Sequence, residues 1–245
     1  MAGVRAEMLF IHLSKGCDDD DEDEQEASSA QFLNEPVRYS DDDKLLLDAQ
    51  GMPVMMTWES EIMRRSATLF KKNGRILNIG FGMGIIDNYI QDLLSPIEHV
   101  IIEAHPDVLA HMKRTGWYDK PNVRILEGRW QQHMDSLAEE GHVFDGIYYD
   151  VYQETYSELR KFAENVVGLL DSDGVWSFFH GLGADRQTFY DVYTILVELD
   201  FGEMGFTVEY EDISARVDAN EWKGSNHNHK YWTLDTYKMP KIRFT

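Results

Sequence analysis

The chain is poor in cysteine and in long apolar runs, and each shortage excludes a class of protein. Cys17 is the only cysteine among 245 residues, so no disulfide can form within the chain and we expect a reducing compartment. No stretch approaches the roughly 20 apolar residues that span a bilayer. The N-terminal segment MAGVRAEMLFIHLSKG lacks the apolar core and cleavage pattern of a signal peptide. We therefore expect a cytoplasmic and nuclear protein with no membrane partner.

Basic residues are also scarce. Lysine and arginine number 23 against 44 aspartates and glutamates, which gives a formal net charge of -21. Phosphate binding needs a basic face, so nucleic acid is excluded as an expected partner. A basic protein or a small guanidino compound would instead be attracted. We expect a monomer that meets such a substrate.

Acidic residues concentrate near the N-terminus. The run DDDDEDEQE, from Asp18 to Glu26, cannot be buried, because like charges repel one another. We expect residues 1–30 to be a disordered acidic segment and residues 31–245 to form one domain. An apolar content of 43% supports a substantial core for that domain.

Strand and helix patterns alternate through most of the domain. A leading segment, Phe32 to Trp58, precedes the first predicted helix. Predicted strands lie near 75–79, 98–103, 122–126, 143–149 and 174–179, and predicted helices near 59–72, 84–94, 106–115, 130–140, 155–170 and 186–200. This alternation predicts an α/β fold with a parallel sheet covered on both faces.

The pattern changes at the C-terminal end. Two further strands, 204–212 and 231–237, follow without an intervening helix, so we expect an antiparallel pair of which one member inserts into the sheet. That ending distinguishes the sheet of class-I methyltransferases from an NAD-binding Rossmann sheet, whose sixth strand is parallel.

A glycine-rich turn follows the first apolar strand in RILNIGFGMG, residues 75–84. Gly80, Gly82 and Gly84 let the backbone turn tightly and let a ligand approach. The next strand ends at Glu103, which can accept hydrogen bonds from ribose hydroxyls. NAD, FAD and S-adenosylmethionine sites share this layout.

Two further segments favour S-adenosylmethionine. GLLDSDGVWSFF, residues 168–179, resembles the polar turn before the fifth strand of class-I methyltransferases. LEGRW, residues 126–130, places Trp130 at the end of a strand, where an adenine would lie. An isolated tryptophan can equally be simple core packing.

Two acids suggest a cationic methyl acceptor. Asp150 ends the strand VFDGIYYD at the same edge of the sheet, whereas Asp145 can be its exposed start. Glu59 lies just before the first strand of the alternation and can be either a helix cap or a second site carboxylate. Paired carboxylates grip the N–H fork of a guanidinium and orient one nitrogen toward a methyl donor.

At these residues the chain resembles a known family. VMMTWESEIM, ILNIGFGMGI, IIEAH, ILEGRW and FDGIYYD are similar, in order and spacing, to the motifs of guanidinoacetate methyltransferases. The similarity is closer to fungal arginine methyltransferases that modify the delta nitrogen (type IV), which share GLGADR, residues 181–186, and an ending like YWTLDTYKMPKIRF. It covers about residues 32–245. It implies a class-I S-adenosylmethionine-dependent methyltransferase, with a Rossmann-like seven-stranded sheet whose last strand is antiparallel, and residues 31–245 as its catalytic domain.

The resemblance implies a role for each matching residue. The predicted catalytic residues are Glu59 and Asp150, which would hold the guanidinium, and Tyr152 beside them. The predicted S-adenosylmethionine contacts are Phe32, Met55, Met63, Gly80, Phe81, Gly82, Met83, Gly84, Ile85, Glu103, Ala104, His105, Arg129, Trp130, Gln131 and Asp150. The methionines alone would more often be core packing.

Some departures keep other functions open. The fungal enzymes carry ankyrin-type repeats ahead of this domain that are absent here, and His180 stands where an asparagine is expected. The twin-glutamate loop and Thr-His-Trp motif of common arginine methyltransferases are absent, which argues against omega methylation. His227 and His229 have no partner ligands at suitable spacing, so we expect no metal.

The leading hypothesis is methylation of the delta nitrogen of arginine in a basic protein, such as a ribosomal protein. The alternatives are methylation of guanidinoacetate, an NAD-dependent oxidoreductase, and a cofactor-binding module without catalysis. The predicted final antiparallel strands disfavour the oxidoreductase, and Glu59 with Asp150 argues against the inactive module.

Overall fold

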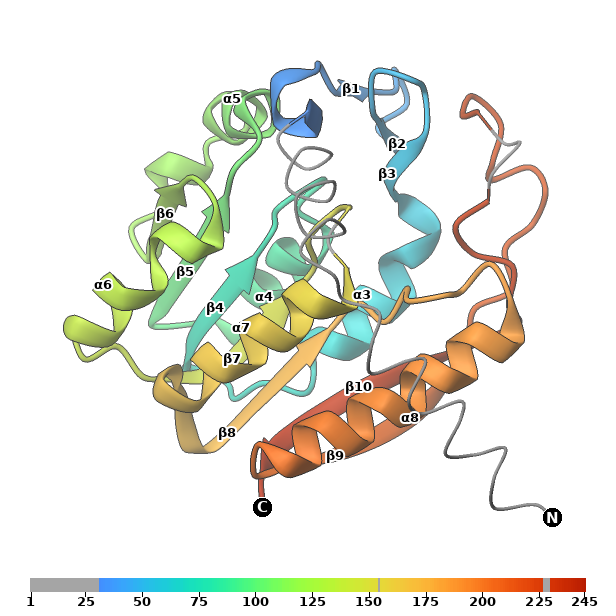
Figure 1. The fold of residues 1–245 in the computed structure, drawn as a ribbon. Coiled ribbons are helices and arrows are strands. Elements are labelled where there is room, and N and C mark those ends of the chain that lie inside the picture. The colour runs from blue at the N-terminus through green and yellow to red at the C-terminus, as the bar shows by residue number, and fades with distance from the viewer. Residues whose placement is uncertain (1–30, 154, 227–229) are drawn as a thin grey trace, which may run out of the picture.

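A seven-stranded sheet forms the centre of the protein (Figure 1). The computed structural model describes residues 31–153, 155–226 and 230–245. In chain order the strands of this sheet are β4 (Arg75–Ile79), β5 (Glu98–Glu103), β6 (Val123–Glu127), β7 (Phe144–Tyr149), β8 (Leu170–Phe178), β9 (Phe206–Ser214) and β10 (Thr236–Phe244). In space they lie in the order β6-β5-β4-β7-β8-β10-β9.

The strand directions confirm the predicted α/β fold. β4 to β8 pair in parallel, while β10 lies between β8 and β9 and is antiparallel to both. The prediction of a Rossmann-like sheet whose last strand is antiparallel is therefore correct. The predicted disordered segment, residues 1–30, lies outside the described residues and stays a prediction.

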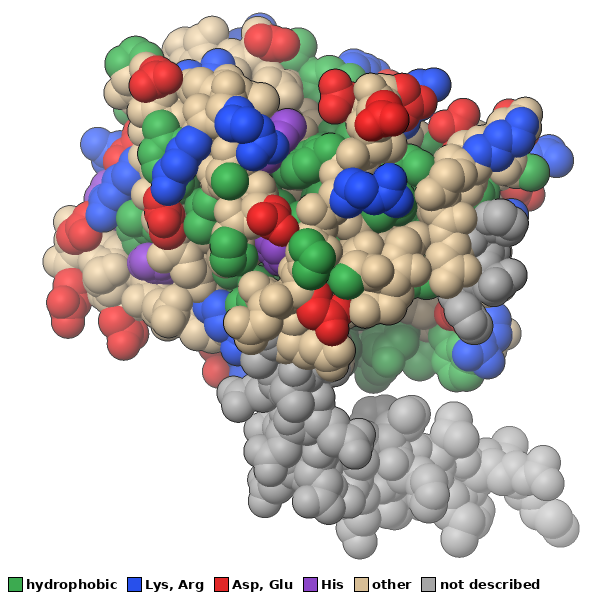
Figure 2. Space-filling model, turned by 90° about the horizontal axis from the view of Figure 1, so that it is seen from above, with side chains coloured by type: hydrophobic (Ala, Val, Ile, Leu, Met, Phe, Trp, Pro, Cys, Tyr) green, Lys and Arg blue, Asp and Glu red, His purple; other side chains and the backbone are tan. Residues whose placement is uncertain are grey.

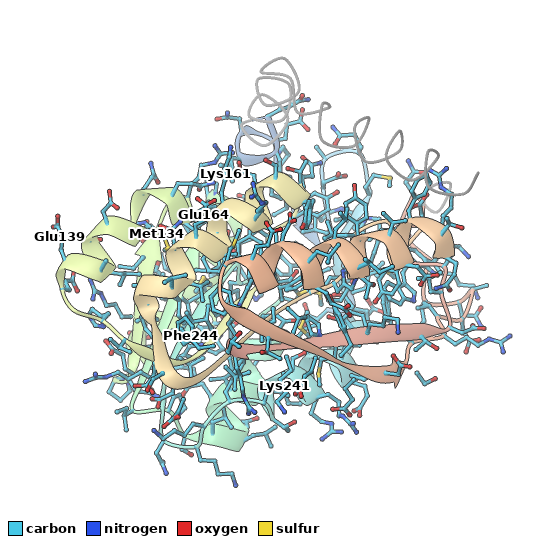
Figure 3. All side chains as sticks on the ribbon, turned by 60° about the horizontal axis from the view of Figure 1, so that its bottom comes forward. Met134, Glu139, Lys161, Glu164, Lys241 and Phe244 are labelled. Atoms are coloured by element: carbon cyan, nitrogen blue, oxygen red, sulfur yellow. The ribbon has the colours of Figure 1, made fainter. Side chains whose placement is uncertain are left out.

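Helices cover both faces of the sheet. They are α3 (Ser60–Ala67), α4 (Ile85–Leu94), α5 (Pro106–Arg114), α6 (Met134–Glu139), α7 (Tyr156–Leu169) and α8 (Gln187–Glu203), with short 3-10 turns η1 (Thr57–Glu59), η2 (Trp117–Asp119) and η3 (Trp130–Gln132). α3, α4 and α5 pack on one face, and α6, α7 and α8 pack on the other (Figures 1 and 3).

The alternation of side-chain direction along each strand explains why the sheet has an apolar core on both faces. Along β7, Ile147 and Tyr149 belong to the core under α7 and α8, whereas Tyr148 between them belongs to the core under α3 and α4. Successive side chains of a strand point to opposite faces, so a strand buried on both faces is a continuous apolar run. All three side chains are nearly inaccessible to solvent.

A second, three-stranded sheet was not predicted from the sequence. It consists of β1 (Arg38–Tyr39), β2 (Leu45–Leu47) and β3 (Pro53–Met56), all antiparallel. It lies above the central sheet in Figure 1. Strands of two to four residues are too short for a period-two pattern to be recognised.

The last strand is displaced from its predicted place. The prediction put it at 231–237, whereas β10 runs from Thr236 to Phe244 and pairs with β9 along its whole length. Pro240 lies inside it, and proline usually argues against a central strand because it has no N–H to donate. The carbonyl of Pro240 instead accepts a hydrogen bond from the Ser177 hydroxyl at 2.6 Å.

Smaller corrections concern the ends of elements. The predicted helix 59–72 is the turn η1 followed by α3, which ends at Ala67, and the predicted helix 130–140 is η3 followed by α6. β8 begins at Leu170 rather than at 174. The predicted polar turn is present as an interruption, since the pairing of β8 with β7 shifts from Leu170 directly to Val175.

The outer face of α8 is unusually apolar. Phe189, Val192, Ile195 and Leu199 recur along it at helical spacing, and each is more than a third exposed. Within the described part of the chain, no helix combines the length and hydrophobicity needed to cross a bilayer.

Candidate active site

A cavity of about 290 Å³ lies where the parallel strands end. This is where open α/β sheets bind ligands. In Figure 2, which looks down on the molecule from above, acidic, basic and hydrophobic side chains are interspersed. Twelve of the eighteen predicted site residues line the cavity: Phe32, Met55, Glu59, Gly80, Gly82, Glu103, Ala104, His105, Arg129, Trp130, Asp150 and Tyr152.

The other six predicted residues do not line it: Met63, Phe81, Met83, Gly84, Ile85 and Gln131. Met63 is fully buried, and its Sδ receives the Tyr148 hydroxyl at 3.3 Å, as expected of core packing. The Phe81 ring packs edge-on against Trp117, with ring centroids 5.1 Å apart. The predicted contacts of these six residues with a ligand stay predictions.

The glycine turn after β4 depends on close backbone approach. Gly80 has a φ of +88°, and a Cβ there would lie 2.0 Å from the carbonyl oxygen of Asp150. Only glycine fits such a position without displacing its neighbour. The turn therefore brings the end of β4 directly against the end of β7.

A buried polar network holds this turn from below. Asn78 Nδ2 donates to the carbonyl of Gly80 and to Asp87 Oδ1, both at 2.8 Å. His99 Nε2 lies 3.2 Å from the same Asp87 oxygen, and all three side chains are fully buried. Buried polar groups need such partners, so the network fixes the conformation of the turn.

Glu103 ties the turn to the end of β5. Its Oε2 accepts the N–H of Phe81 at 2.8 Å and faces that of Gly82 at 3.4 Å. Its Oε1 accepts the N–H groups of Ala104 at 2.8 Å and His105 at 2.7 Å. Because a carboxylate offers about four lone-pair sites, only the long contact with Gly82 leaves room for a further donor.

Glu59 caps a turn and also lies on the cavity wall, so its position is compatible with both functions considered for it, and its function as a site carboxylate stays a prediction. Its Oε1 accepts the backbone N–H of Met56 at 2.9 Å, which caps η1, and the same carboxylate lines the cavity. The hydroxyl of Tyr231 also donates to Oε1, at 2.5 Å. Burial raises the pKa of Glu59 to about 7, against the opposing effect of these two hydrogen bonds.

Asp150 is the second buried carboxyl of the cavity. Its backbone N–H donates to Ile79 at 2.9 Å, but its Oδ2 is buried without a hydrogen-bond partner among the described residues. Burial, and then the charges of Glu59 and Asp87, raise the pKa of Asp150 well above its usual value. Because Asp150 lines the cavity, a ligand bound there could supply a donor to this oxygen.

Aromatic rings close the opposite side of the cavity. Phe32 packs against Tyr152 and His105, with ring centroids 4.8 and 4.9 Å away. The hydroxyl of Tyr152 donates to Asp48 Oδ2 at 3.2 Å, which ties this loop to the turn between β2 and β3. Trp130 is both core and cavity wall, because it packs on Phe162 and still lines the space.

Tyr231 was missed as a site residue. The sequence placed it at the start of the last strand, whereas it lies in the segment between β9 and β10 and contacts Glu59 across 172 positions of sequence. No local pattern signals a contact over such a separation.

Metal ligands were not predicted for this chain. In residues 31–153, 155–226 and 230–245, no group of three His, Cys, Asp or Glu side chains is arranged to hold a metal ion. His227 and His229 lie outside those residues, so the prediction for them is untested.

Solved structures share this fold at low sequence identity. A precorrin-6Y C5,15-methyltransferase from Geobacter metallireducens superposes with a TM-score of 0.56 at 16% identity, covering 88% of this chain and 100% of its own. A spermidine synthase from Thermotoga maritima gives a TM-score of 0.54 at 15% identity, covering 85% and 72%. At such identities the similarity defines the class of fold, a class-I methyltransferase fold, and not the reaction.

Sequence comparison identifies the family. The model of the guanidinoacetate N-methyltransferase family matches residues 22–223, so the chain belongs to that family. Protein arginine N-methyltransferase 2 of Aspergillus fumigatus is 48% identical over 222 residues, covering 89% of this chain and 51% of the relative. Its counterpart in Yarrowia lipolytica is 44% identical over 229 residues, covering 89% and 48%. The chain thus spans about half the length of the curated relatives it matches.

Proposed function

We propose that this chain transfers a methyl group from S-adenosylmethionine to the delta nitrogen of arginine in a basic protein. The observation that carries the proposal is a pair of carboxyls in one cavity beside the glycine turn: Glu59, which is a buried residue, and Asp150, whose Oδ2 is inaccessible to solvent. Relatives named protein arginine N-methyltransferase 2 support arginine as the acceptor.

The residues of the cavity fit S-adenosylmethionine. A ribose hydroxyl can donate to Glu103, where it competes only with the 3.4 Å contact of the Gly82 N–H. Phe32, Ile102 and Val108 give apolar walls for an adenine. Bound there, S-adenosylmethionine supplies an electrophilic methyl group on a sulfonium sulfur. The contacts predicted from the sequence are part of this proposal.

The two acids can hold and orient the acceptor. A guanidinium presents a planar fork of N–H donors, which two carboxyls fix in one plane. The unpartnered buried Oδ2 of Asp150 supports this residue as the acceptor of that fork, and the position of Glu59 on the same cavity supports it as the acceptor of a further N–H. Burial raises the pKa of Glu59 to about 7, so in its ionised form Glu59 can also take the proton that the attacking nitrogen loses.

The cavity favours arginine within a protein over guanidinoacetate, although the family name favours the latter. A small acceptor with its own carboxylate needs a nearby positive group. Among the described residues that line the cavity, Arg129 alone carries a fixed positive charge. It follows β6, at the edge of the sheet and two strands away from β4. Methylation of guanidinoacetate remains the second candidate.

The proposal includes the setting of the reaction. A net charge of -21 supports a basic protein as substrate, no nucleic-acid partner and a chain that acts as a monomer. The single cysteine supports the cytoplasm and nucleus as its location.

One experiment tests the function. The protein is incubated with labelled S-adenosylmethionine and either a ribosomal protein extract or guanidinoacetate, and the products are identified by mass spectrometry. Delta-monomethylarginine supports the proposal, creatine supports the second candidate, and cofactor binding without either product supports a non-catalytic module.

A variant tests the acceptor contact. Asp150→Ala should lower kcat/KM by about ten- to a hundredfold or more, since it removes a charge-assisted contact. Its affinity for S-adenosylmethionine should change far less. Asp145→Asn is the matched control, because Asp145 lies at the other end of β7 and pairs with Lys71. Equal losses in turnover and cofactor affinity would show that Asp150 does not act on the acceptor.

A further inference from the structure

The segment between β9 and β10 reaches from the far edge of the sheet to the cavity. Its described residues include Trp222 and Trp232, which pack with β2 and β3 in a separate core cluster. That packing places Tyr231 on the cavity wall beside Glu59. Neither the glycine turn nor the two acids of the proposed function explains why a tyrosine is held there.

The hydrogen bonds around Tyr231 have a fixed direction. The indole Nε1 of Trp58 lies 3.0 Å from the Tyr231 oxygen and can only donate, so the tyrosine oxygen accepts from it. The tyrosine hydrogen is then free to point at Glu59 Oε1, 2.5 Å away. Trp58, Tyr231 and Glu59 therefore form a chain of donors that ends on one carboxylate oxygen.

That oxygen receives a second donor as well. The backbone N–H of Met56 lies 2.9 Å from the same Oε1. Two short donors occupy Oε1, so the other oxygen, Oε2, is left for a ligand. The carboxyl cannot rotate to exchange its oxygens without breaking both bonds.

We propose that Tyr231 is a positioning residue for the methyl acceptor, which holds Oε1 of Glu59 and thereby leaves Oε2 to the guanidinium. This inference rests on the proposed function, because it assigns a partner to one of its two acids. Tyr231 acts through Glu59 and need not touch the transferred methyl group. It also explains why the segment between β9 and β10 is anchored by two tryptophans.

The hydroxyl of Tyr231 also affects the pKa of Glu59. Tyr148 of β7, Asp150 directly after β7 and Tyr231 in the segment before β10 are the titratable groups that interact electrostatically with Glu59. The Tyr231 hydrogen bond lowers the pKa of Glu59 against the larger effect of burial. Without the hydroxyl, Glu59 should stay protonated to a higher pH and accept a guanidinium N–H less readily.

Tyr231→Phe isolates the hydroxyl. The ring contacts with Trp58 and Trp222, at centroid distances of 6.0 and 5.3 Å, remain possible in the variant. Tyr210→Phe is the matched control, since the Tyr210 hydroxyl donates only to the backbone of Thr194, away from the cavity. Trp58→Phe is a second variant that removes the donor to Tyr231 but keeps the tyrosine–glutamate bond.

The experiment measures kcat, KM for the acceptor, the Kd of S-adenosylmethionine and the pH profile of kcat/KM for all four proteins. Tyr231→Phe should lower kcat/KM at pH 7 by about ten- to a hundredfold and move the acidic limb of the profile to higher pH. The Kd of S-adenosylmethionine should stay within about twofold. Trp58→Phe should change the same quantities in the same direction but less, and Tyr210→Phe should change none.

An unmoved acidic limb in Tyr231→Phe, or a loss no larger than that of Tyr210→Phe, would overturn the inference and leave the proposed function intact. Absence of any methylated product from the wild-type protein would instead refute the proposed function. In that case the inference loses its methyl acceptor, and the pH dependence of unfolding decides only whether Tyr231 lowers the pKa of Glu59. The step caused by Glu59 must move to higher pH in Tyr231→Phe, and an unmoved step overturns the inference. If Tyr231→Phe does not fold, the profile of Trp58→Phe decides in the same way.

Discussion

Replacing Glu59 by glutamine should make the protein more stable at neutral pH while it removes activity. The carboxyl is 3% exposed, and burial raises its pKa from an ordinary 4.5 to about 7. The folded protein therefore binds this proton more tightly than the unfolded chain. The contribution of Glu59 to wild-type stability must therefore fall as the pH rises from about 4.5 to about 7, and this contribution stays level above that.

The magnitude follows from the shift. A difference of about 2.5 pH units corresponds to about 3 kcal/mol of unfolding free energy, since each unit is worth about 1.36 kcal/mol. Glutamine has nearly the same shape and keeps an oxygen for the Met56 and Tyr231 donors, but it cannot ionise. The advantage of Glu59→Gln over wild type should grow from below about 1 kcal/mol at pH 5 to about 3 kcal/mol at pH 8.

Urea denaturation of the cofactor-free protein at pH 5 and pH 8, at one ionic strength, measures both values. Glu164→Gln is the control, because Glu164 is exposed on the outer side of α7 (Figure 3). Its effect should be small and nearly the same at both pH values. If the stability difference between Glu59→Gln and wild type does not change with pH, ionisation of the buried Glu59 does not destabilise the folded protein, and the reasoning is refuted.

Two further variants test the cofactor side of the cavity. Gly80→Ala should destabilise the fold by about 1–3 kcal/mol or more, because the new Cβ meets the carbonyl of Asp150. Gly141→Ala, at a similar positive φ but with nothing within 4 Å, should cost less in the same urea denaturation; equal costs would leave only the backbone angle as the cause. Glu103→Gln should raise the Kd of S-adenosylmethionine about tenfold or more in calorimetry. The side-chain amide N–H of glutamine would face backbone N–H donors that the carboxylate of Glu103 now accepts. The control is Glu127→Gln, because Glu127 is exposed and lies opposite Glu103 in the register of β5 and β6. An equal rise in Kd for both variants would contradict the role of Glu103.

Much of the central sheet could be predicted because its signals are local. Each parallel strand is an unbroken apolar run flanked by turn residues, and β4 and β5 have the predicted bounds. β10 could not be placed, because Pro240 and the lysines beside it resemble a tail and not a central strand. Its position is decided by pairing with β9, a contact between segments that no sequence window contains.

The residues of the candidate site also divide into those that local sequence signals predict and those that depend on contacts between distant segments. Glu103 ends a strand of the parallel sheet, and Gly80 and Asp150 directly follow two others. The fold rule that ligands bind at the carboxyl ends of such strands therefore brings the three residues together. Glu59 was ambiguous because one side chain both caps a turn and lines the cavity. Tyr231 could not be found, since its place depends on how the chain after β9 packs against β2 and β3.

The energetics of the two acids explain why they are informative about the acceptor. Each is buried near the other, and the described residues provide neither with a basic side chain as an ion-pair partner. Such an arrangement costs folding stability at neutral pH, so packing alone does not account for it. A guanidinium entering the cavity would relieve that cost by supplying N–H donors and positive charge to both carboxyls at once. The carboxyl pair is thus complementary to a cation that no described side chain supplies, and the stability gained by Glu59→Gln should equal part of what the acceptor returns on binding.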